Sequence, residues 1–255
     1  MDKPTMQEVD FYNQLAESYD AMTRFDERLG RERDLLKSWV EAGCWQTVLD
    51  AACGTGLHAI ALASLGIKTT ASDASAAMLE QARRNAQQHG VAIDWLHLRL
   101  QDHGQLEKNV DAVLCLGNSL PHVLNAEELQ VTLRGFHALL HPGGQLIIQL
   151  LNYDRILARR ERVVGINSDG RRDYLRYYTF LDTLLRFTIV TIDRGLEKLQ
   201  TTLQETLLYP YTRTELEKAL IDAGFSAPAM YADLNQTPWS SETSRDLVCA
   251  AAKPE

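Results

Sequence analysis

The sequence predicts an α/β protein with a mostly parallel sheet and a separate antiparallel insertion. Strand and helix patterns alternate between residues 47 and 150, which is typical of parallel strands joined by crossover helices. Residues 48–53 form an apolar run typical of a buried strand. The glycine turn Gly54-Thr55-Gly56 and a helical pattern from Leu57 follow it. After residue 170, three strand patterns follow one another without a helix, which indicates antiparallel pairing.

The first part of the chain is expected to alternate helices with strands. Ser75 is a suitable N-cap for one helix and Gly90 its stop, and His141-Pro142-Gly143-Gly144 is expected to close another. The predicted helices are 8–19, 31–42, 57–65, 75–89 and 126–140. The predicted strands are 47–51, 68–72, 94–98, 111–116 and 145–150.

The later part of the chain is expected to hold the insertion and the end of the core. Asp193-Arg194-Gly195 is a hairpin turn signal, and we expect the insertion to lie over the ligand crevice. Thr212 or Thr214 is the expected cap of a helix at 212–223. The predicted strands are 174–180, 184–192, 198–209, 229–232 and 247–252.

Composition excludes several classes of function. The net charge of -8 argues against a nucleic-acid binder, which normally presents a basic face. The one basic region is interpreted as a solvated face rather than a polyanion site, and its arginines are at 159, 160, 162, 171, 172 and 176. Four cysteines without C-x-x-C spacing are expected to be mostly small buried hydrophobes.

No membrane or secretion signal is evident in the sequence. It has no apolar run of the ~18 residues that a membrane span needs, and its polar start, Met1-Asp2-Lys3-Pro4, is no signal peptide. We therefore expect a cytoplasmic enzyme. His137 and His141 have zinc-compatible helical spacing but no third ligand. His141 is expected in a last helical turn, where a cation suits the helix dipole, so no metal is expected.

The glycine turn is the feature most informative about function. Glycine lets backbone approach a ligand closely, and in open α/β sheets ligands bind beyond the carboxyl ends of the strands. Asp73 ends the next strand, where an acid can accept hydrogen bonds from a ribose. The turn is not that of a dinucleotide site, because Ala59 stands where the third glycine of that motif would fall. It is not a P-loop either, because no Gly-Lys-Ser/Thr follows. The alternative is a βα turn that uses glycine only for packing.

These motifs resemble a known family. Asp50-Ala51-Ala52-Cys53-Gly54-Thr55-Gly56 followed by Ser72-Asp73-Ala74-Ser75 is similar to the first two motifs of class I S-adenosylmethionine (SAM) methyltransferases. Residues 116–122, 141–144 and Asn152-Tyr153-Asp154 extend the resemblance to the glycine and sarcosine N-methyltransferase branch and its bacterial small-molecule relatives. The match is good over about residues 45–155 and loose elsewhere.

The resemblance implies a fold and a division of the chain. It implies a Rossmann-like sheet of seven strands, mostly parallel with the last antiparallel, flanked by helices. Residues 1–157 would form the N-terminal lid helices and the SAM-binding core. Residues 158–209 would form the substrate lobe, and 210–255 would complete the core.

The resemblance also implies a cofactor and its contacts. SAM would be the methyl donor and S-adenosylhomocysteine the product. The glycine turn would lie next to the methionine part of SAM, and Asp73 would bind the ribose. Asp102 would hold the adenine amino group, unless it is only a turn acid, and Arg28 or Arg31 would meet the SAM carboxylate. The remaining positions implied to contact SAM are Tyr12, Tyr19, Ala52, Gly54, Gly56, Ala74, Met78, His103, Leu116 and His122.

Several of these positions have a plainer interpretation. Tyr12 and Tyr19 resemble an N-terminal lid, but aromatic residues at helical spacing also suit a core. His122 lies near the methionine end of SAM by resemblance, and otherwise only begins a helix beside Pro121.

Asn118 is the best candidate for a catalytic residue on the acceptor side. An amide there can orient an amine or a carboxylate, although it also suits a backbone-capping turn. The animal glycine enzyme has an arginine before Asn-Tyr-Asp, where this chain has Leu151. Either Arg176 replaces it from the insertion, or the acceptor is not glycine, which we favour. Four insertion tyrosines could form an amine cage or only pack on strand faces: Tyr174, Tyr177, Tyr178 and Tyr209.

The leading hypothesis is a SAM-dependent methyltransferase acting on the amine nitrogen of a small molecule. The alternatives are O- or C-methylation of a natural product or sugar, or SAM binding without catalysis. A nucleic-acid methyltransferase is disfavoured by charge. After the strand at 111–116 the chain has Asn118-Ser119-Leu120-Pro121 in place of an Asn/Asp-Pro-Pro-aromatic motif. The sequence does not indicate the oligomeric state.

Overall fold

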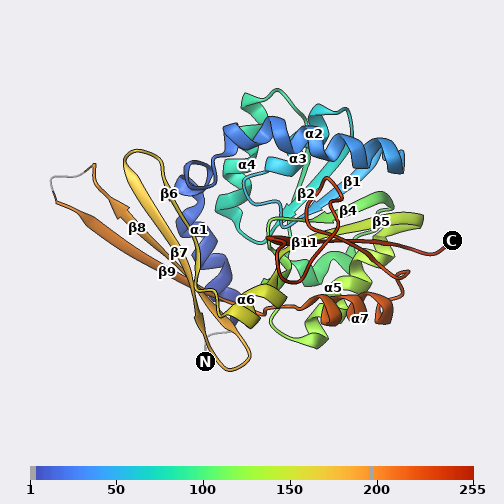
Figure 1. The fold of residues 1–255 in the computed structure, drawn as a ribbon. Helices are drawn as coiled ribbons and strands as arrows, with labels where there is room; N and C mark the ends of the chain where they lie inside the picture. Colours follow the sequence, from blue (N-terminus) through green and yellow to red (C-terminus); the bar gives the residue numbers. More distant parts are fainter. Residues whose placement is uncertain (1–3, 196–197) are drawn as a thin grey trace.

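The computed structural model describes residues 4–195 and 198–255, and Figure 1 shows two separate sheets. The strands of the larger sheet are β1 (Thr47–Ala51), β2 (Lys68–Asp73), β3 (Asp94–His97), β4 (Val110–Cys115), β5 (Leu140–Leu151), β10 (Ala229–Tyr231) and β11 (Asp246–Ala252). Their order is β10-β11-β5-β4-β1-β2-β3. β1 to β5 are parallel, whereas β11 runs antiparallel to both neighbours, which confirms the predicted fold class.

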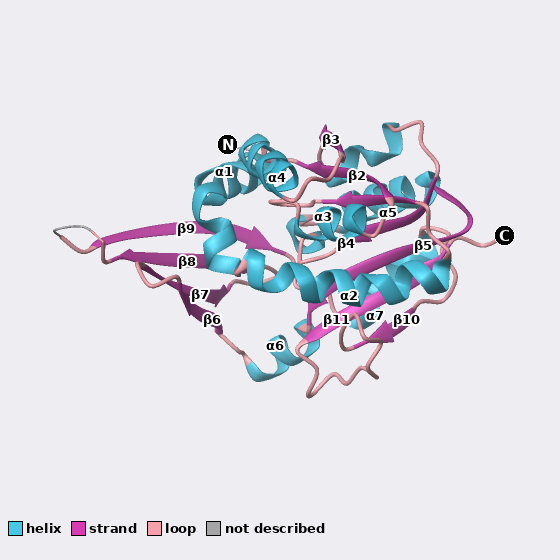
Figure 2. Ribbon diagram, turned by 90° about the horizontal axis from the view of Figure 1, so that it is seen from above, coloured by secondary structure: helices cyan, strands magenta, loops and turns pink. Residues whose placement is uncertain are grey.

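Helices cover both faces of this sheet (Figures 1 and 2). The α-helices are α1 (Pro4–Thr23), α2 (Phe25–Gly43), α3 (Leu57–Ser64), α4 (Ala76–Gln88), α5 (Ala126–Leu139), α6 (Tyr153–Arg159) and α7 (Arg213–Asp222). Two short 3-10 helices are η1 (Leu100–Gln105) and η2 (Leu120–His122). Apolar side chains of α2 and α3 pack on one face with Val48 and Leu114, and those of α5 and α7 pack on the other.

The local signals explain where several helices begin. Ser75 caps α4 through its hydroxyl, which accepts a hydrogen bond from the backbone of Met78, as predicted. Thr212 caps α7 in a reciprocal arrangement with Glu215, so Thr212 and not Thr214 is the cap.

The insertion is a four-stranded antiparallel sheet that projects beside α1 (Figures 1 and 2). Its strands, in spatial order, are β6 (Val163–Ser168), β7 (Arg172–Phe180), β8 (Leu185–Asp193) and β9 (Gln200–Leu208). Phe11 and Leu15 of α1 pack against Tyr174 and Ile189 of this sheet. Because α1 also packs on Met78 of α4, it joins the insertion to the larger sheet at the ligand-binding edge.

The observed elements differ from the predicted ones at several places. No strand was predicted at β6, a sheet edge that contains an irregularity near Gly165, and no helix at α6, which Asn152 caps. α2 begins at Phe25, earlier than predicted. His141 lies in β5 rather than in a last helical turn, because the backbone around Gly143 pairs with Lys253.

Candidate functional site

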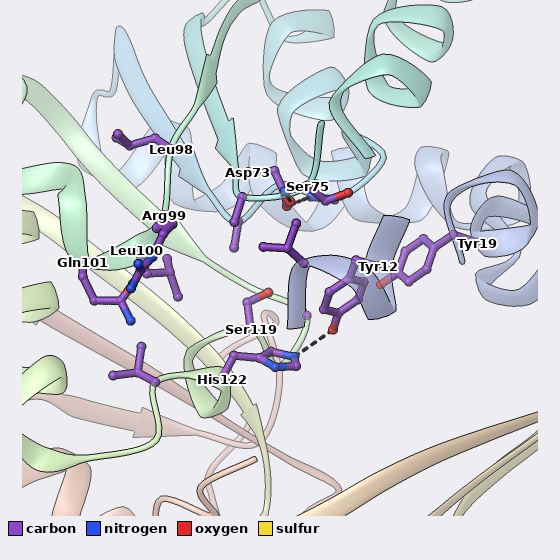
Figure 3. A pocket seen from close by; sticks show the side chains of 16 residues that line it. Tyr12, Tyr19, Asp73, Ser75, Leu98, Arg99, Leu100, Gln101, Ser119 and His122 are labelled. Carbon is purple, nitrogen blue, oxygen red and sulfur yellow. Dashed lines mark hydrogen bonds between the residues drawn. The ribbon is translucent and has the colours of Figure 1, made fainter. Parts of the chain in front are cut away.

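Two adjoining cavities lie beyond the carboxyl ends of β1, β2 and β4. Their volumes are about 60 and about 580 Å³, and both are lined by Tyr12, Tyr19, Gly117 and His122. Figure 3 shows the smaller cavity, with Asp73 and Ser75 on one side and Tyr12 and His122 on another. This is the edge at which α/β sheets bind ligands.

The glycine turn and Asp73 form one unit at the smaller cavity. Gly54 has φ of 56°, and its N–H donates a hydrogen bond of 2.8 Å to Asp73 Oδ2. The N–H of Ser75 donates a bond of the same length to Asp73 Oδ1. Burial raises the pKa of Asp73, and these backbone hydrogen bonds oppose the shift. A carboxylate oxygen can accept a second hydrogen bond, so Asp73 keeps acceptor capacity toward the cavity.

Gly56 has a packing role. It precedes α3 with φ of 90°, and a Cβ there would lie 3.2 Å from both Ala82 Cβ and Trp95 Cη2. It is not among the residues that line either cavity, whereas Ala52 and Ala74 line the smaller one as expected.

The side of the cavity assigned to adenine differs from the expectation. Leu98, Arg99, Leu100 and Gln101 line it (Figure 3). Asp102 and His103 are not among the lining residues. The ring of His103 is buried, and its nitrogens lie 2.8 Å from Ser72 Oγ and 3.0 Å from the carbonyl oxygen of Leu100. His103 therefore fastens η1 to β2 instead of facing the cavity.

Two further positions expected at the cofactor are part of the core. Met78 is buried against α1 and the insertion, and Leu116 is buried among side chains of α2 and the larger sheet. Neither side chain lines a cavity, so the structure does not bring them to the site.

A hydrogen bond joins two residues that line both cavities. Tyr12 Oη and His122 Nε2 lie 2.8 Å apart, and this bond links α1 to η2 (Figure 3). Burial lowers the pKa of His122 to about 3, so its ring is neutral near pH 7. Tyr12 and Tyr19 thus line both cavities from the N-terminal helix.

The larger cavity contains cationic side chains from three parts of the chain. Arg28 and Arg31 come from α2, Arg176 from β7, and Arg245 precedes β11. Burial lowers the pKa of Arg176, and its Nε has no hydrogen-bond partner among the described residues. Glu32 also lines this cavity.

Glu32 connects Arg28 to a buried group behind the cavity. Arg28 Nη2 lies 3.4 Å from Glu32 Oε1, and His58 Nε2 lies 3.8 Å from Glu32 Oε2, which is too long for a hydrogen bond. Burial opposes ionisation of Glu32, but the neighbouring His58 and Arg28 lower its pKa to about 2. Asp50 lies in the field of the same histidine, and its own burial raises its pKa to about 6.

The acceptor side is only partly as expected. Asn118, Leu151, Arg176 and Tyr178 line the larger cavity, whereas Tyr209 does not. The Tyr209 hydroxyl donates a hydrogen bond of 2.9 Å to Glu215, on the helix α7. Tyr209 is therefore removed from the candidate site.

The side chain of Asn118 is already engaged. Its Oδ1 accepts a hydrogen bond of 2.9 Å from the N–H of Leu151, and the Tyr153 hydroxyl lies 3.1 Å from the same oxygen. Asn118 has φ of 66°, a conformation that asparagine tolerates better than most residues. These contacts hold the loop after β4 against the end of β5.

Other residues that line the cavities were not predicted from the sequence. Gly117 and Ser119 flank Asn118 and could have been found as residues that follow a parallel strand. Gln149, Arg245 and Asp246 reach the larger cavity because β5 and β11 pair, which no local signal indicates.

Among residues 4–195 and 198–255, no group of three or more His, Cys, Asp or Glu side chains is arranged to hold a metal ion. No helix in the same ranges has the length and apolar character needed to cross a membrane.

Known proteins share both the sequence motifs and the fold. Residues 48–144 match a methyltransferase domain family. The chain is 32% identical over 166 residues to a glycine/sarcosine N-methyltransferase of Halorhodospira halochloris. It is 29% identical over 232 residues to a glycine/sarcosine/dimethylglycine N-methyltransferase of Actinopolyspora halophila.

These alignments cover 61% and 87% of this chain, but only 60% and 38% of the relatives. The chain therefore spans less than two thirds of the length of either relative. A SAM-dependent methyltransferase from Clostridium acetobutylicum shares the fold with a TM-score of 0.81 at 19% identity, over 96% of this chain and 99% of that one.

Proposed function

Since this chain belongs to the class I SAM-dependent methyltransferases, we propose that it transfers a methyl group from SAM to an amine nitrogen of a small-molecule acceptor. The observation that carries the proposal is the unit of Gly54 and Asp73 at a small cavity that adjoins a much larger one. The residues that line the smaller cavity suit the ribose of SAM chemically, and the larger cavity has room for the methionine end and an acceptor.

The residues present fit SAM chemically. Asp73 has acceptor capacity for the ribose hydroxyls, and the backbone at Gly54 has no side chain to obstruct a ligand. Arg28 and Arg31 supply the positive charge that a carboxylate requires. No lysine or Gly-Lys-Ser/Thr segment is present in this turn to bind a triphosphate.

The chain would contribute mainly positioning and exclusion of water. Bound SAM would supply a methyl group that is already activated on a sulfonium. Holding an amine near that methyl group removes much of the entropic part of the barrier. Tyr12, Tyr19 and Tyr178 present aromatic surface around the larger cavity, which suits the positive charge that an amine acquires.

Nitrogen is proposed as the acceptor atom because the relatives above are named N-methyltransferases. O- or C-methylation keeps the same cofactor site and is the competing hypothesis. A SAM-binding protein without transfer activity is a third.

An acceptor screen tests these hypotheses. The purified protein is incubated with SAM and a panel of amines, phenols and amino and neutral sugars, and release of S-adenosylhomocysteine is measured. We expect release with at least one amine and formation of its N-methyl product by mass spectrometry. Release only with phenols or neutral sugars would show that the acceptor atom is not nitrogen and would favour O- or C-methylation. SAM binding without release from any compound would favour the non-catalytic hypothesis.

A further inference from the structure

Asp246 is a carboxylate in the larger cavity that the sequence analysis did not identify. It is the first residue of β11 and pairs in register with Leu151 at the end of β5. It lines the cavity together with Asn118, Leu151 and Tyr178, and it is half-buried. Its side chain thus stands at the acceptor side, beside the position where the animal glycine enzyme has an arginine.

A chain of hydrogen bonds fixes the orientation of this carboxylate. The N–H of Gly117 donates to Gln149 Oε1 at 3.3 Å, and Gln149 Nε2 donates to Asp246 Oδ2 at 3.1 Å. Because the amide oxygen of Gln149 is held by a backbone N–H, its nitrogen must face Asp246. The loop after β4 therefore sets the position of the Asp246 carboxylate.

The second oxygen of Asp246 is available to a ligand. Among the residues that the structure describes, none donates a hydrogen bond to Asp246 Oδ1. The amide oxygen of Asn118, which lines the same cavity, is not available to a ligand in this way. It already accepts a hydrogen bond from the N–H of Leu151 and contacts the Tyr153 hydroxyl. Burial raises the pKa of Asp246, while the charge of Arg245 and the hydrogen bond from Gln149 act in the opposite direction.

We propose that Asp246 Oδ1 accepts a hydrogen bond from the N–H of the acceptor amine and so directs the nitrogen lone pair to the reacting methyl group. This inference rests on the proposed function. The neutral amine forms a bond to the methyl carbon while the carbon–sulfur bond breaks, and that electron pair remains on sulfur in S-adenosylhomocysteine. The nitrogen becomes an ammonium, which then loses its proton to solvent. A fixed carboxylate stabilises the charge that develops on nitrogen.

The arrangement of the site also predicts a preference among acceptors. An amine with an N–H can donate to Asp246, whereas a phenol or an alcohol would use its only proton for that bond. A negatively charged oxygen would be repelled by the carboxylate. Asp246 therefore favours primary and secondary amines over oxygen acceptors.

The test compares Asp246→Asn with Asp182→Asn, which removes a carboxylate from an exposed position of the insertion. Calorimetry measures binding of sarcosine, ethanolamine and 2-phenylethylamine to each protein saturated with S-adenosylhomocysteine. Asp246→Asn is expected to weaken the tightest-binding of these amines by about 10- to 150-fold, the range for a hydrogen bond to a charged group. Its affinity for S-adenosylhomocysteine should stay within threefold of wild type, and Asp182→Asn should match wild type throughout.

Equal amine affinity in Asp246→Asn and wild type would overturn the proposal, as would a wild type that binds none of the three amines. A parallel loss of S-adenosylhomocysteine affinity would assign Asp246 a structural role instead. If wild type and Asp246→Asn methylate an amine equally well, the proposed function stands and the role of Asp246 is wrong. If no amine is bound or methylated, both fail.

Discussion

Replacement of Asp73 by alanine tests whether this carboxylate is needed for SAM binding, for folding, or for both. The carboxylate accepts backbone hydrogen bonds of 2.8 Å from Gly54 and Ser75, so the substitution removes both of these as well as the proposed ribose contact. Each hydrogen bond to a charged group contributes about 1.5–3 kcal/mol. Loss of the ribose contact alone should weaken S-adenosylhomocysteine and SAM by roughly 10- to 150-fold.

The effect on folding is expected to be smaller than two such bonds would imply. Burial raises the pKa of Asp73, so the folded protein already bears a cost for holding this charge, and alanine removes that cost. We therefore expect the free energy of unfolding to fall by about 1–3 kcal/mol and the fold to survive.

Asp111 offers a matched control. Its carboxylate accepts backbone hydrogen bonds of 2.8 Å from both Gln46 and Thr47, and it lines neither cavity. Asp111→Ala should lose stability while its affinity for S-adenosylhomocysteine stays within threefold. Calorimetry measures the affinities, and urea denaturation measures stability. Normal ligand binding by Asp73→Ala would refute the ribose role, and failure of that variant alone to fold would make Asp73 structural.

Three further predictions concern buried charge and the acceptor site. Because burial raises the pKa of Asp50 to about 6, wild type should lose up to about 3 kcal/mol of stability as pH rises from about 4 through 6. In urea denaturation, Asp50→Asn should not show this loss of stability. An identical pH dependence of stability in both proteins would contradict the prediction. Glycine should be a poorer substrate than bulkier amines, since Leu151 cannot pair with a carboxylate. Its efficient turnover, read by S-adenosylhomocysteine release, would mean that Arg176 holds the carboxylate. Asn118→Ala should slow methyl transfer, because the loop after β4 loses its hydrogen bond to the N–H of Leu151. The SAM dissociation constant should stay within a few-fold of wild type, and a large loss of SAM affinity would refute this prediction.

Local signals were sufficient to predict the turn and the carboxylate that are proposed to bind SAM. The strand, glycine turn and helix at 47–64 are adjacent in sequence, and Asp73 ends the next strand, so parallel pairing of β1 with β2 brings them together. The cap at Ser75 is equally local. These features could be predicted because each depends on neighbouring residues or on the direction of parallel strands.

Features that depend on fine orientation or on distant pairing could not be predicted. Whether Gln101, Asp102 or His103 faces the cavity depends on how the short helix η1 turns, and His103 turns inward to Ser72. Asp246 reaches the cavity only because β11 pairs with β5. Sequence pattern does not specify either arrangement.

Binding of the cofactor is the most direct test of the central claim. Calorimetry with the purified chain measures dissociation constants for SAM, S-adenosylhomocysteine, NAD and ATP under one set of conditions. We expect one equivalent of SAM or S-adenosylhomocysteine to bind and neither NAD nor ATP to bind tightly, since the Gly54 turn and Asp73 lack phosphate-binding groups. Tighter binding of NAD than of SAM would contradict the assignment.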